Sequence, residues 1–300
     1  MFKFTIYNIN FCCEIKSQII QEFLYEKFGH FDFKNNNEKL IGIIELETKD
    51  WITDDENVEH VRNTIIFYDR NELCVYFCVK NNGNADYITA QAILLEYILG
   101  ILSENNIYYL HASSTTVHQS PQNGLILTGN PGAGKTTLML KLLERDEKPI
   151  ADDMLFFTID NNKNPILLAN KMAPRLFQKN LDDNFKLLNQ NIKFKGKYKT
   201  SININSTYSE ITRPKYILFL YNDGFLVPSI KRITQIEAFK KILPQIKLSK
   251  VFDNKKYLES ISILIDLCVF LEVHIVKNVD QNIRYILDYL SQTDLEKDGY

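Results

Sequence analysis

A glycine-rich stretch at residues 129–136 constrains this chain more than any other part of its sequence. It reads Gly-Asn-Pro-Gly-Ala-Gly-Lys-Thr and matches the phosphate-binding pattern G-x-x-x-x-G-K-[ST] at every fixed position. Glycines let the backbone point several N–H groups at an anion, Lys135 adds a positive charge, and the Thr136 hydroxyl suits magnesium. The residues expected to contact a nucleotide are Gly129, Asn130, Pro131, Gly132, Ala133, Gly134, Lys135, Thr136 and Thr137.

The sequences on either side of the loop supply the context that this motif needs. Residues 124–128 form a short apolar run that predicts a buried parallel strand. Residues 137–144 are rich in helix formers, and a helix that starts at the loop adds its positive end to the anion site. The order strand, loop, helix makes a chance match in a surface turn the poorer interpretation.

The composition describes a globular chain with little net charge. Its 300 residues suffice for one large or two modest domains, and 45% of them are hydrophobic, which is enough for a core. The formal net charge is −2, so electrostatics gives no reason to expect nucleic acid as the main partner.

Membrane and secretory segments are not expected. No segment approaches about 18 uninterrupted apolar residues, the length typical of a membrane-spanning helix. Glu96 interrupts the apolar residues 90–102, and the first residues alternate like a strand without a secretory signal. We therefore expect a cytoplasmic protein with no membrane partner.

The cysteine pattern favours buried thiols over a metal site. The chain has five cysteines, and Cys74 and Cys78 would share one face of a strand. No second Cys/His pair completes a zinc set, so buried structural thiols are the better interpretation.

Two regions differ in pattern along the chain. Residues 1–84 predict a β-rich subdomain that ends at the turn Asn81-Asn82-Gly83-Asn84, and residues 85–300 predict an α/β domain with the loop at its centre. Strands are expected at residues 2–6, 40–46, 64–68, 73–79, 108–117, 124–128, 154–159 and 216–221. Helices are expected at residues 16–28, 85–102, 137–144, 236–243 and 283–290. Turns are expected at Asn35-Asn36-Asn37 and at residues 120–124, and residues 255–275 carry both helix and strand signals.

Asp152 and Asp153 form the second chemically informative pair. They follow the apolar residues 149–151, and in phosphate-loop proteins a carboxylate at the end of a neighbouring strand commonly faces the magnesium. One Asp suffices for the metal, so two suggest that the other accepts a proton from an attacking hydroxyl. Adjacent strand residues point to opposite faces, so both can serve only if the chain turns there. A solvated acidic turn is the alternative.

His111 lies near the end of the strand that precedes the loop strand. If the two strands are neighbours, its imidazole can reach a transferring phosphoryl group. On local sequence alone, a lone histidine is more often a hydrogen-bonded structural residue than a catalyst.

Three motifs in this order resemble the C-terminal domain of the HPr kinase/phosphorylase family: His111-Ala112-Ser113, the loop at residues 129–136, and Ile150-Ala151-Asp152-Asp153. Residues 216–220, 230–234 and 237–238 give weaker support. Ile6-Tyr7-Asn8-Ile9 and the long helix before His111 resemble shorter HPr-kinase-related kinases, including those that accompany ribosomally made peptides such as lasso peptides. The resemblance touches most of the chain, but only residues 111–153 carry specific motifs.

The resemblance implies a fold and a set of roles. The fold is the phosphoenolpyruvate-carboxykinase-like variant of the phosphate-loop α/β architecture, preceded here by a β-rich subdomain. Lys135 contacts the phosphates, and Thr136 binds magnesium with Asp152 beside it. Asp153 resembles the aspartate that accepts the hydroxyl proton, and His111 resembles the active-site histidine. ATP and Mg²⁺ are the implied cofactors.

One departure from the family pattern concerns the substrate. No run resembling Glu-x-Arg-Gly-Leu-Gly follows the Asp pair, which counts against HPr as the acceptor and against phosphorylase activity. Four cations could steady a phosphate, although each fits a solvated surface residue better: Arg175, Lys197, Lys199 and Arg213.

The sequence therefore predicts a magnesium- and ATP-dependent kinase that phosphorylates a hydroxyl, most plausibly a Ser or Thr of a peptide or small protein. A small-molecule hydroxyl kinase shares every motif. A nucleotide-binding regulatory protein without transferase activity, and an authentic HPr kinase/phosphorylase, are further alternatives. A homo-oligomer is left open.

Overall fold

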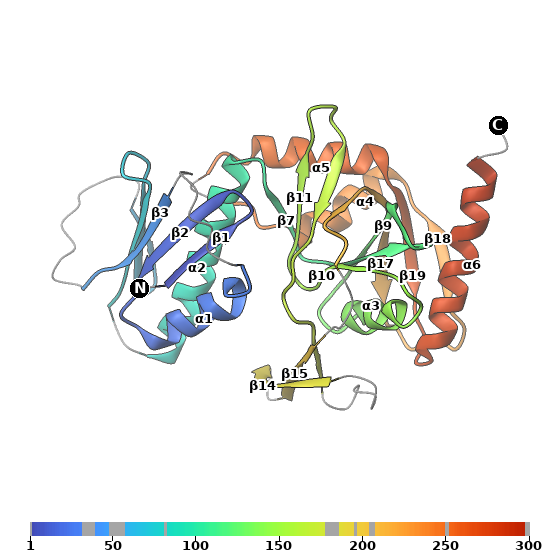
Figure 1. The fold of residues 1–300 in the computed structure, drawn as a ribbon, viewed down its shortest axis with the longest axis horizontal. Helices are drawn as coiled ribbons and strands as arrows, with labels where there is room; N and C mark the ends of the chain where they lie inside the picture. Colours follow the sequence, from blue (N-terminus) through green and yellow to red (C-terminus); the bar gives the residue numbers. More distant parts are fainter. Residues whose placement is uncertain are drawn as a thin grey trace. The chain divides into compact units, whose positions relative to one another are not determined.

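The protein is seen in a computed structural model that divides into two compact units. The structure describes residues 2–31, 40–47, 58–80, 83–177, 186–194, 197–203, 208–249 and 252–297. One unit comprises Met1–Asn105 with Leu248–Asn254, and the other comprises Asn106–Lys247 with Lys255–Tyr300. Both mix helices with sheets, so the expected α/β class is confirmed at this coarse level (Figure 1).

The first unit is built on one mixed sheet. Its strands are β1 (Phe2–Ile6), β2 (Ile9–Glu14), β3 (Leu40–Glu45), β4 (Glu59–Val61), β5 (Thr64–Asp69) and β6 (Cys74–Val79). Their order is β1-β2-β3-β6-β5-β4, and β3 runs parallel to both β2 and β6. Helix α1 (Gln18–Phe28) packs on β1, where the rings of Phe4 and Phe28 stack 5.1 Å apart.

The long helix α2 (Asn84–Glu104) belongs to this first unit. It packs against α1, β5 and β6, and the first compact unit extends to Asn105. Among the described residues, α2 alone is long and apolar enough to cross a membrane, but 50% of that window is buried inside the protein. A core helix passes the same test, so this is weak evidence for a span.

The cysteines lie where buried thiols were expected. Cys13, Cys74 and Cys78 are buried, and all five cysteines are free. Burial raises the pKa of the Cys74 thiol to about 11, so it stays protonated at neutral pH. Across the described ranges, no group of three or more His, Cys, Asp or Glu side chains forms a metal cluster.

The central sheet of the second unit carries the glycine-rich loop. Its strands are β8 (Ser113–Val117), β9 (Ser120–Thr128), β10 (Pro149–Ala151), β17 (Pro214–Tyr221), β18 (Ser229–Arg232) and β19 (Val269–His274). The order is β10-β8-β9-β17-β19-β18, and β17 runs parallel to both β9 and β19. The loop at the end of β9 therefore lies at the same edge as the ends of β17 and β19.

Helices cover both faces of this sheet (Figure 1). They are α3 (Lys135–Leu143), α4 (Gln235–Ile242), α5 (Lys255–Leu267) and α6 (Val279–Lys297). Alternate side chains point to opposite faces, so Leu127 and Leu218 join the core of α3 and α6, while Ile126 and Ile217 join that of α4 and α5. A capping box between Thr234 and Glu237 starts α4, and the short helix η3 (Leu243–Gln245) follows it.

Two smaller sheets complete the second unit. One contains β7 (Tyr108–Leu110), β11 (Leu155–Ile159), β12 (Pro165–Leu168) and β16 (Ile211–Thr212). The other contains β13 (Arg175–Phe177), β14 (Lys186–Phe194) and β15 (Lys197–Asn203).

The strand expected at residues 108–117 is two strands, which corrects the prediction. β7 pairs with β11, whereas β8 pairs with β9 and β10 in the central sheet. The chain changes sheet at His111, and it changes sheet again at Asp152–Met154, between β10 and β11. Local β-propensity continues across 108–117, so only the long-range pairing reveals the break.

Other expectations differ in extent. The turn expected at residues 120–124 lies at His118 and Gln119, whose φ angles of 57° and 54° suit a tight hairpin, and β9 already begins at Ser120. The closing helix runs over Val279–Lys297 and exceeds the expected 283–290. Residues 255–275 resolve into α5 and β19. The turn at Asn35-Asn36-Asn37 lies outside the described residues.

Candidate active site

The loop between β9 and α3 depends on three glycines with positive φ. The φ angles are 145° at Gly129, 88° at Gly132 and 94° at Gly134, a region that other residues rarely adopt. A Cβ at Gly129 would also lie 2.6 Å from the Leu220 carbonyl oxygen. Backbone freedom and close approach to β17 therefore both require glycine at the start of the loop.

Lys135 closes the loop from inside. Its side chain is only 8% exposed, and Nζ donates a hydrogen bond to the Gly129 carbonyl at 2.8 Å. The first residue of α3 is thus tied to the first residue of the loop. Asn130, Pro131 and Gly132 are exposed, so the outer part of the loop is accessible to a ligand.

Asp152 is buried beside the start of α3. The Thr136 hydroxyl donates to it, at 2.9 Å from Oδ1 and 3.1 Å from Oδ2, and the Ser113 hydroxyl donates to Oδ1 at 2.5 Å. The side chains of Thr136, Asp152 and Ser113 come from α3, the end of β10 and the start of β8. Sequence spacing predicted roles for the first two, whereas Ser113 has no role of its own in the motif His111-Ala112-Ser113.

Asp153 faces His111 across the two chain crossings. His111 Nδ1 lies 3.3 Å from Asp153 Oδ1 and 3.1 Å from the Asp153 carbonyl oxygen. Asp153 has a φ of 64°, and the Met154 N–H donates to the Asp152 carbonyl at 2.7 Å. The chain therefore turns at the strand end, which is the condition stated above for both adjacent carboxylates to serve one site.

Asn170 holds this acidic turn in place through two hydrogen bonds. It is fully buried; its backbone N–H donates to the Ile150 carbonyl, and its side-chain Nδ2 donates to the Met154 carbonyl, both at 2.7 Å. One asparagine thus holds the chain on both sides of the Asp pair. It lies beyond the motif, and no sequence signal singles it out.

Two tyrosines border the carboxylates. Burial raises the pKa of Tyr208 to about 12, and the nearby Asp152 carboxylate adds to the shift. Burial also raises the pKa of Tyr109, with Asp153 and Tyr257 contributing. Both phenols stay protonated at neutral pH and remain hydrogen-bond donors.

A charged network that the sequence analysis missed lies at the ends of β17 and β19. Lys241 Nζ is 2.9 Å from Glu272 Oε2 and donates to the Tyr221 hydroxyl at 2.6 Å. His274 contacts Glu272 at 3.3 Å and Asp223 at 2.9 Å. Burial alone would lower the pKa of Lys241, but the hydrogen bonds with Tyr221 and Glu272 outweigh it and raise the pKa.

Of the four cations proposed to steady a phosphate, Arg213 is shown to lie away from the loop. Arg213 lies at the far end of β9, where its backbone exchanges hydrogen bonds with Pro121 and Gly124. Arg175 begins β13 and is half-buried. The side chains of Lys197 and Lys199 lie outside the described residues.

The residues present fit a magnesium ion bound with a polyphosphate. Magnesium prefers oxygen ligands in octahedral geometry and usually keeps waters and phosphate oxygens around it, with one or two protein ligands. The Thr136 hydroxyl and the Asp152 carboxylate are two such oxygens, already in contact. A site of this type does not require the cluster of three side chains that the described residues lack.

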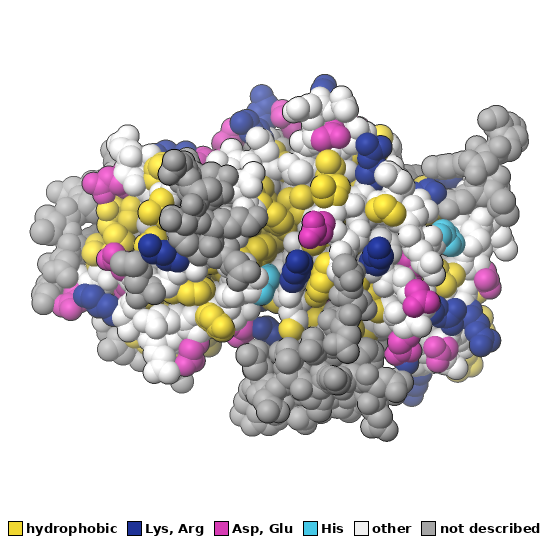
Figure 2. All heavy atoms as spheres, in the orientation of Figure 1, with side chains coloured by type: hydrophobic (Ala, Val, Ile, Leu, Met, Phe, Trp, Pro, Cys, Tyr) yellow, Lys and Arg dark blue, Asp and Glu magenta, His cyan; other side chains and the backbone are white. Residues whose placement is uncertain are grey.

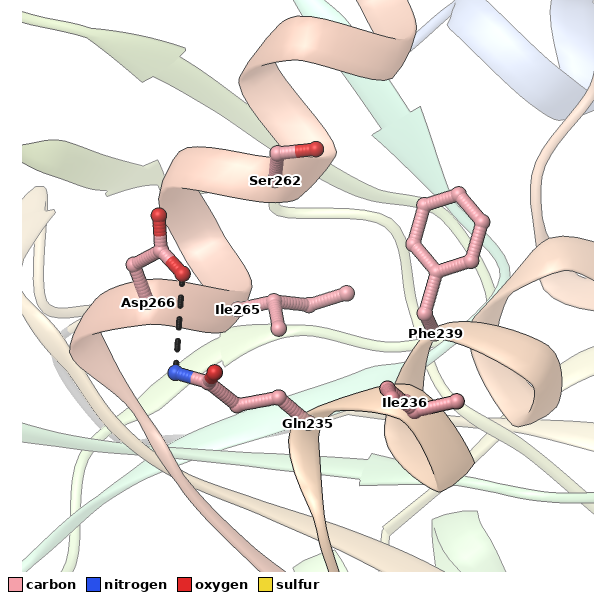
Figure 3. A pocket seen from close by; sticks show the side chains of 6 residues that line it. All are labelled: Gln235, Ile236, Phe239, Ser262, Ile265 and Asp266. Atoms are coloured by element: carbon pink, nitrogen blue, oxygen red, sulfur yellow. Dashed lines mark hydrogen bonds between the residues drawn. The ribbon is translucent and has the colours of Figure 1, made fainter.

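A separate shallow groove lies between α4 and α5 (Figure 3). Gln235, Ile236 and Phe239 line one side, and Ser262, Ile265 and Asp266 line the other. Ile236 is 70% exposed, and Gln235 contacts Asp266 at 3.5 Å. None of the predicted site residues reaches it.

On the face in Figure 2, Lys and Arg are interspersed with Asp and Glu, in keeping with the small net charge.

Comparison with known proteins yields a distant fold likeness. No family model matches the chain, and neither does any curated protein. One similar solved structure is the Hpr(Ser) kinase/phosphatase from Coxiella burnetii, with 11% sequence identity and a TM-score of 0.35. The match covers 64% of this chain and 99% of that one. It is a distant likeness in the arrangement of elements, and the expected HPr-kinase-like character stays a prediction.

Proposed function

We propose that the protein is a magnesium- and ATP-dependent kinase that transfers the γ-phosphoryl group to a hydroxyl, most plausibly of a Ser or Thr in a peptide or small protein. The observation that carries this proposal is a single edge of the central sheet. There the glycine-rich loop, the Thr136–Asp152 contact and the His111–Asp153 pair all lie together.

The donor half of the reaction would use the loop and α3. Backbone N–H groups of residues 129–135 and the positive end of α3 would bind the phosphates, with Lys135 swinging from the Gly129 carbonyl to the outer phosphates. Thr136 and Asp152 would hold the magnesium ion, which neutralises charge on the transferring group when bound. Ser113 keeps the Asp152 carboxylate oriented.

The acceptor half would use Asp153. Its carboxylate is 44% exposed and can accept the proton of an incoming hydroxyl, while His111 holds it in position. Positioning and charge neutralisation do most of the work in phosphoryl transfer. A small-molecule hydroxyl would be activated in the same way, so the acceptor class rests on the sequence resemblance.

The experiment that tests the proposal separates binding from transfer. Asp153→Asn should leave the Kd for Mg·ATP within about twofold and lower transfer by roughly 100- to 10,000-fold, the usual contribution of a general base. Lys135→Ala should weaken Mg·ATP binding itself. Calorimetry gives the first quantity, and mass spectrometry of phosphorylated acceptors gives the second.

Asp146→Asn is the matched control. Asp146 is exposed and also has a positive φ, 66°, so the backbone demand is the same as at Asp153. Asparagine tolerates that conformation. If Asp153→Asn and Asp146→Asn transfer phosphate at the same rate, Asp153 is not a catalytic residue. Mg·ATP binding by the wild type without any transfer or hydrolysis would favour a regulatory nucleotide-binding protein.

A further inference from the structure

A small pocket lies against the start of the glycine-rich loop and is not used by the residues discussed so far. Its volume is about 230 Å³, and its walls include Gly129 and Asn130 of the loop, Phe219 of β17, and Lys240 and Pro244 at the end of α4. A water molecule occupies about 30 Å³ of liquid, whereas small-molecule sites begin near about 300 Å³. The pocket therefore has room for about one side chain.

The pocket has an uncompensated positive charge. Lys241 is held by Glu272 and Tyr221, as described above. Its neighbour Lys240 is exposed and has no ion-pair partner within the part of the chain that the structure describes. The floor next to it is apolar, formed by Phe219 and Pro244.

The pocket is also connected to the proposed acceptor side of the reaction. Gln245 lines it, and the Gln245 carbonyl accepts a hydrogen bond from the backbone N–H of His111 at 2.8 Å. His111 in turn contacts Asp153. This hydrogen bond joins one wall of the pocket to the segment that carries His111.

A buried polar atom lies on the same face of the sheet. The Thr128 hydroxyl is fully buried and has no hydrogen-bond partner among the described residues. Thr128 pairs in register with Phe219, so the two side chains share one face of the sheet. An unpaired buried hydroxyl is unusual in a folded protein and calls for an explanation, such as a water or an ion.

We propose that this pocket is an acceptor subsite that takes an acidic side chain, with Lys240 as the residue that selects it. The carboxylate would pair with Lys240, and its methylene groups would rest on Phe219 and Pro244. Lys241 is a positioning residue, because its contacts with Glu272 and Tyr221 fix the wall beside Lys240. The inference rests on the proposed kinase function, since it assigns the pocket to the acceptor.

The test uses two synthetic peptide pools of equal length, each with one Ser, flanked by Asp and Glu in one pool and by Asn and Gln in the other. The variants are Lys240→Gln, Lys240→Arg and the control Lys256→Gln, an exposed lysine of α5 outside the pocket. Fluorescence anisotropy of labelled pools gives binding in the presence of Mg·ADP, and transfer from labelled ATP gives KM and kcat.

The wild type should bind the acidic pool about tenfold more tightly, which is about 1.4 kcal/mol. Lys240→Gln should lose that preference through KM while kcat stays unchanged, and Lys240→Arg and Lys256→Gln should keep it. If Lys240 only interacted with the negative end of the α4 helix dipole, its replacement would not change the preference between the two pools.

Three results would overturn the inference. Equal binding of both pools by the wild type removes the acidic specificity. If Lys240→Gln keeps the preference for the acidic pool, Lys240 is not the residue that selects the acidic side chain. If Lys240→Gln binds Mg·ATP tenfold more weakly than the wild type, then Lys240 contacts the nucleotide and not an acidic side chain of the acceptor. Absence of transfer with a preserved binding preference would instead defeat the kinase proposal alone, so the two failures are distinguishable.

Discussion

The Asp153 carboxylate lies 3.3 Å from the His111 ring nitrogen, although the two residues are 42 positions apart in the sequence. Both occupy short crossings where the chain leaves one sheet and enters another. The β7–β11 pairing on one side and the β8–β10 pairing on the other bring these crossings together. The contact is therefore a product of topology, because neither crossing alone places an acid near a base.

The hydroxyl of Thr136 offers a test of the magnesium site. Thr136→Val removes the hydroxyl that contacts Asp152 while keeping the branched shape. We expect the magnesium concentration for half-maximal nucleotide binding to rise about tenfold, because one oxygen ligand is lost. Thr136→Ser keeps the ligand and should behave as wild type. A magnesium titration followed by calorimetry checks this, and an unchanged requirement in Thr136→Val would exclude the residue as a ligand.

Asn170 offers a test of how the acidic turn is held. Asn170→Ala leaves the buried Met154 carbonyl without its side-chain donor, which should cost about 1–3 kcal/mol of unfolding free energy. Transfer should fall as well, since Asp153 follows the same turn. Urea unfolding and a kcat measurement below the transition report both effects. Asn164→Ala, in the exposed turn before β12, serves as the control, and equal losses in the two variants would argue against a special role for Asn170.

The glycines of the loop should differ in their tolerance of alanine. At Gly129, an added Cβ would lie 2.6 Å from the Leu220 carbonyl oxygen, and this oxygen belongs to the backbone of β17. At Gly132, no atom lies within 4 Å, so only the positive φ is unfavourable, at about 1 kcal/mol. Gly129→Ala should therefore destabilise the protein by about 2 kcal/mol more than Gly132→Ala. Thermal or urea unfolding decides, and equal stability would mean that the loop is not packed against β17.

Glu272 predicts a pH dependence of stability. The hydrogen bond from Lys241 lowers the pKa of Glu272, against the opposing effect of burial. A carboxylate with a depressed folded pKa stabilises the fold above its unfolded value near 4.5 and loses that contribution as the pH falls through the folded pKa. The wild type should exceed Glu272→Gln by on the order of 1 kcal/mol between pH 6 and 8, with the gap closing below about pH 4.5. If the difference in unfolding free energy between the wild type and Glu272→Gln stays constant down to pH 3, the pKa of Glu272 is not lowered in the way described.

Local sequence predicted the elements that depend on local physics. The loop, the start of α3 and most of the strands followed from glycine spacing, apolar runs and helix formers. The break between β7 and β8 did not follow, because Tyr108 to Val117 contains no glycine or proline to mark it and only pairing with two different sheets separates the strands. The roles proposed for Asp152, Asp153, His111 and Lys135 stay predictions.

The rest of the site depends on contacts between distant positions. Ser113, Asn170 and the network around Lys241 act through hydrogen bonds to partners that no spacing rule connects to them. Ser, Asn and Lys are common surface residues, so their types carry little information until the fold brings them beside a carboxylate or a loop.

The crossings at His111 and at Asp152–Met154 make the candidate base sensitive to register. Each half of the His111–Asp153 pair is anchored in the central sheet and in the sheet that contains β7 and β11, so a slide of one of these sheets past the other would pull the imidazole from the carboxylate. If Asp153 acts as the proposed base, an event that shifts the sheet of β7 and β11 by about an ångström, even far from the loop, would interrupt proton acceptance without moving the glycine-rich loop. The seam between the sheets would then control transfer independently of nucleotide binding.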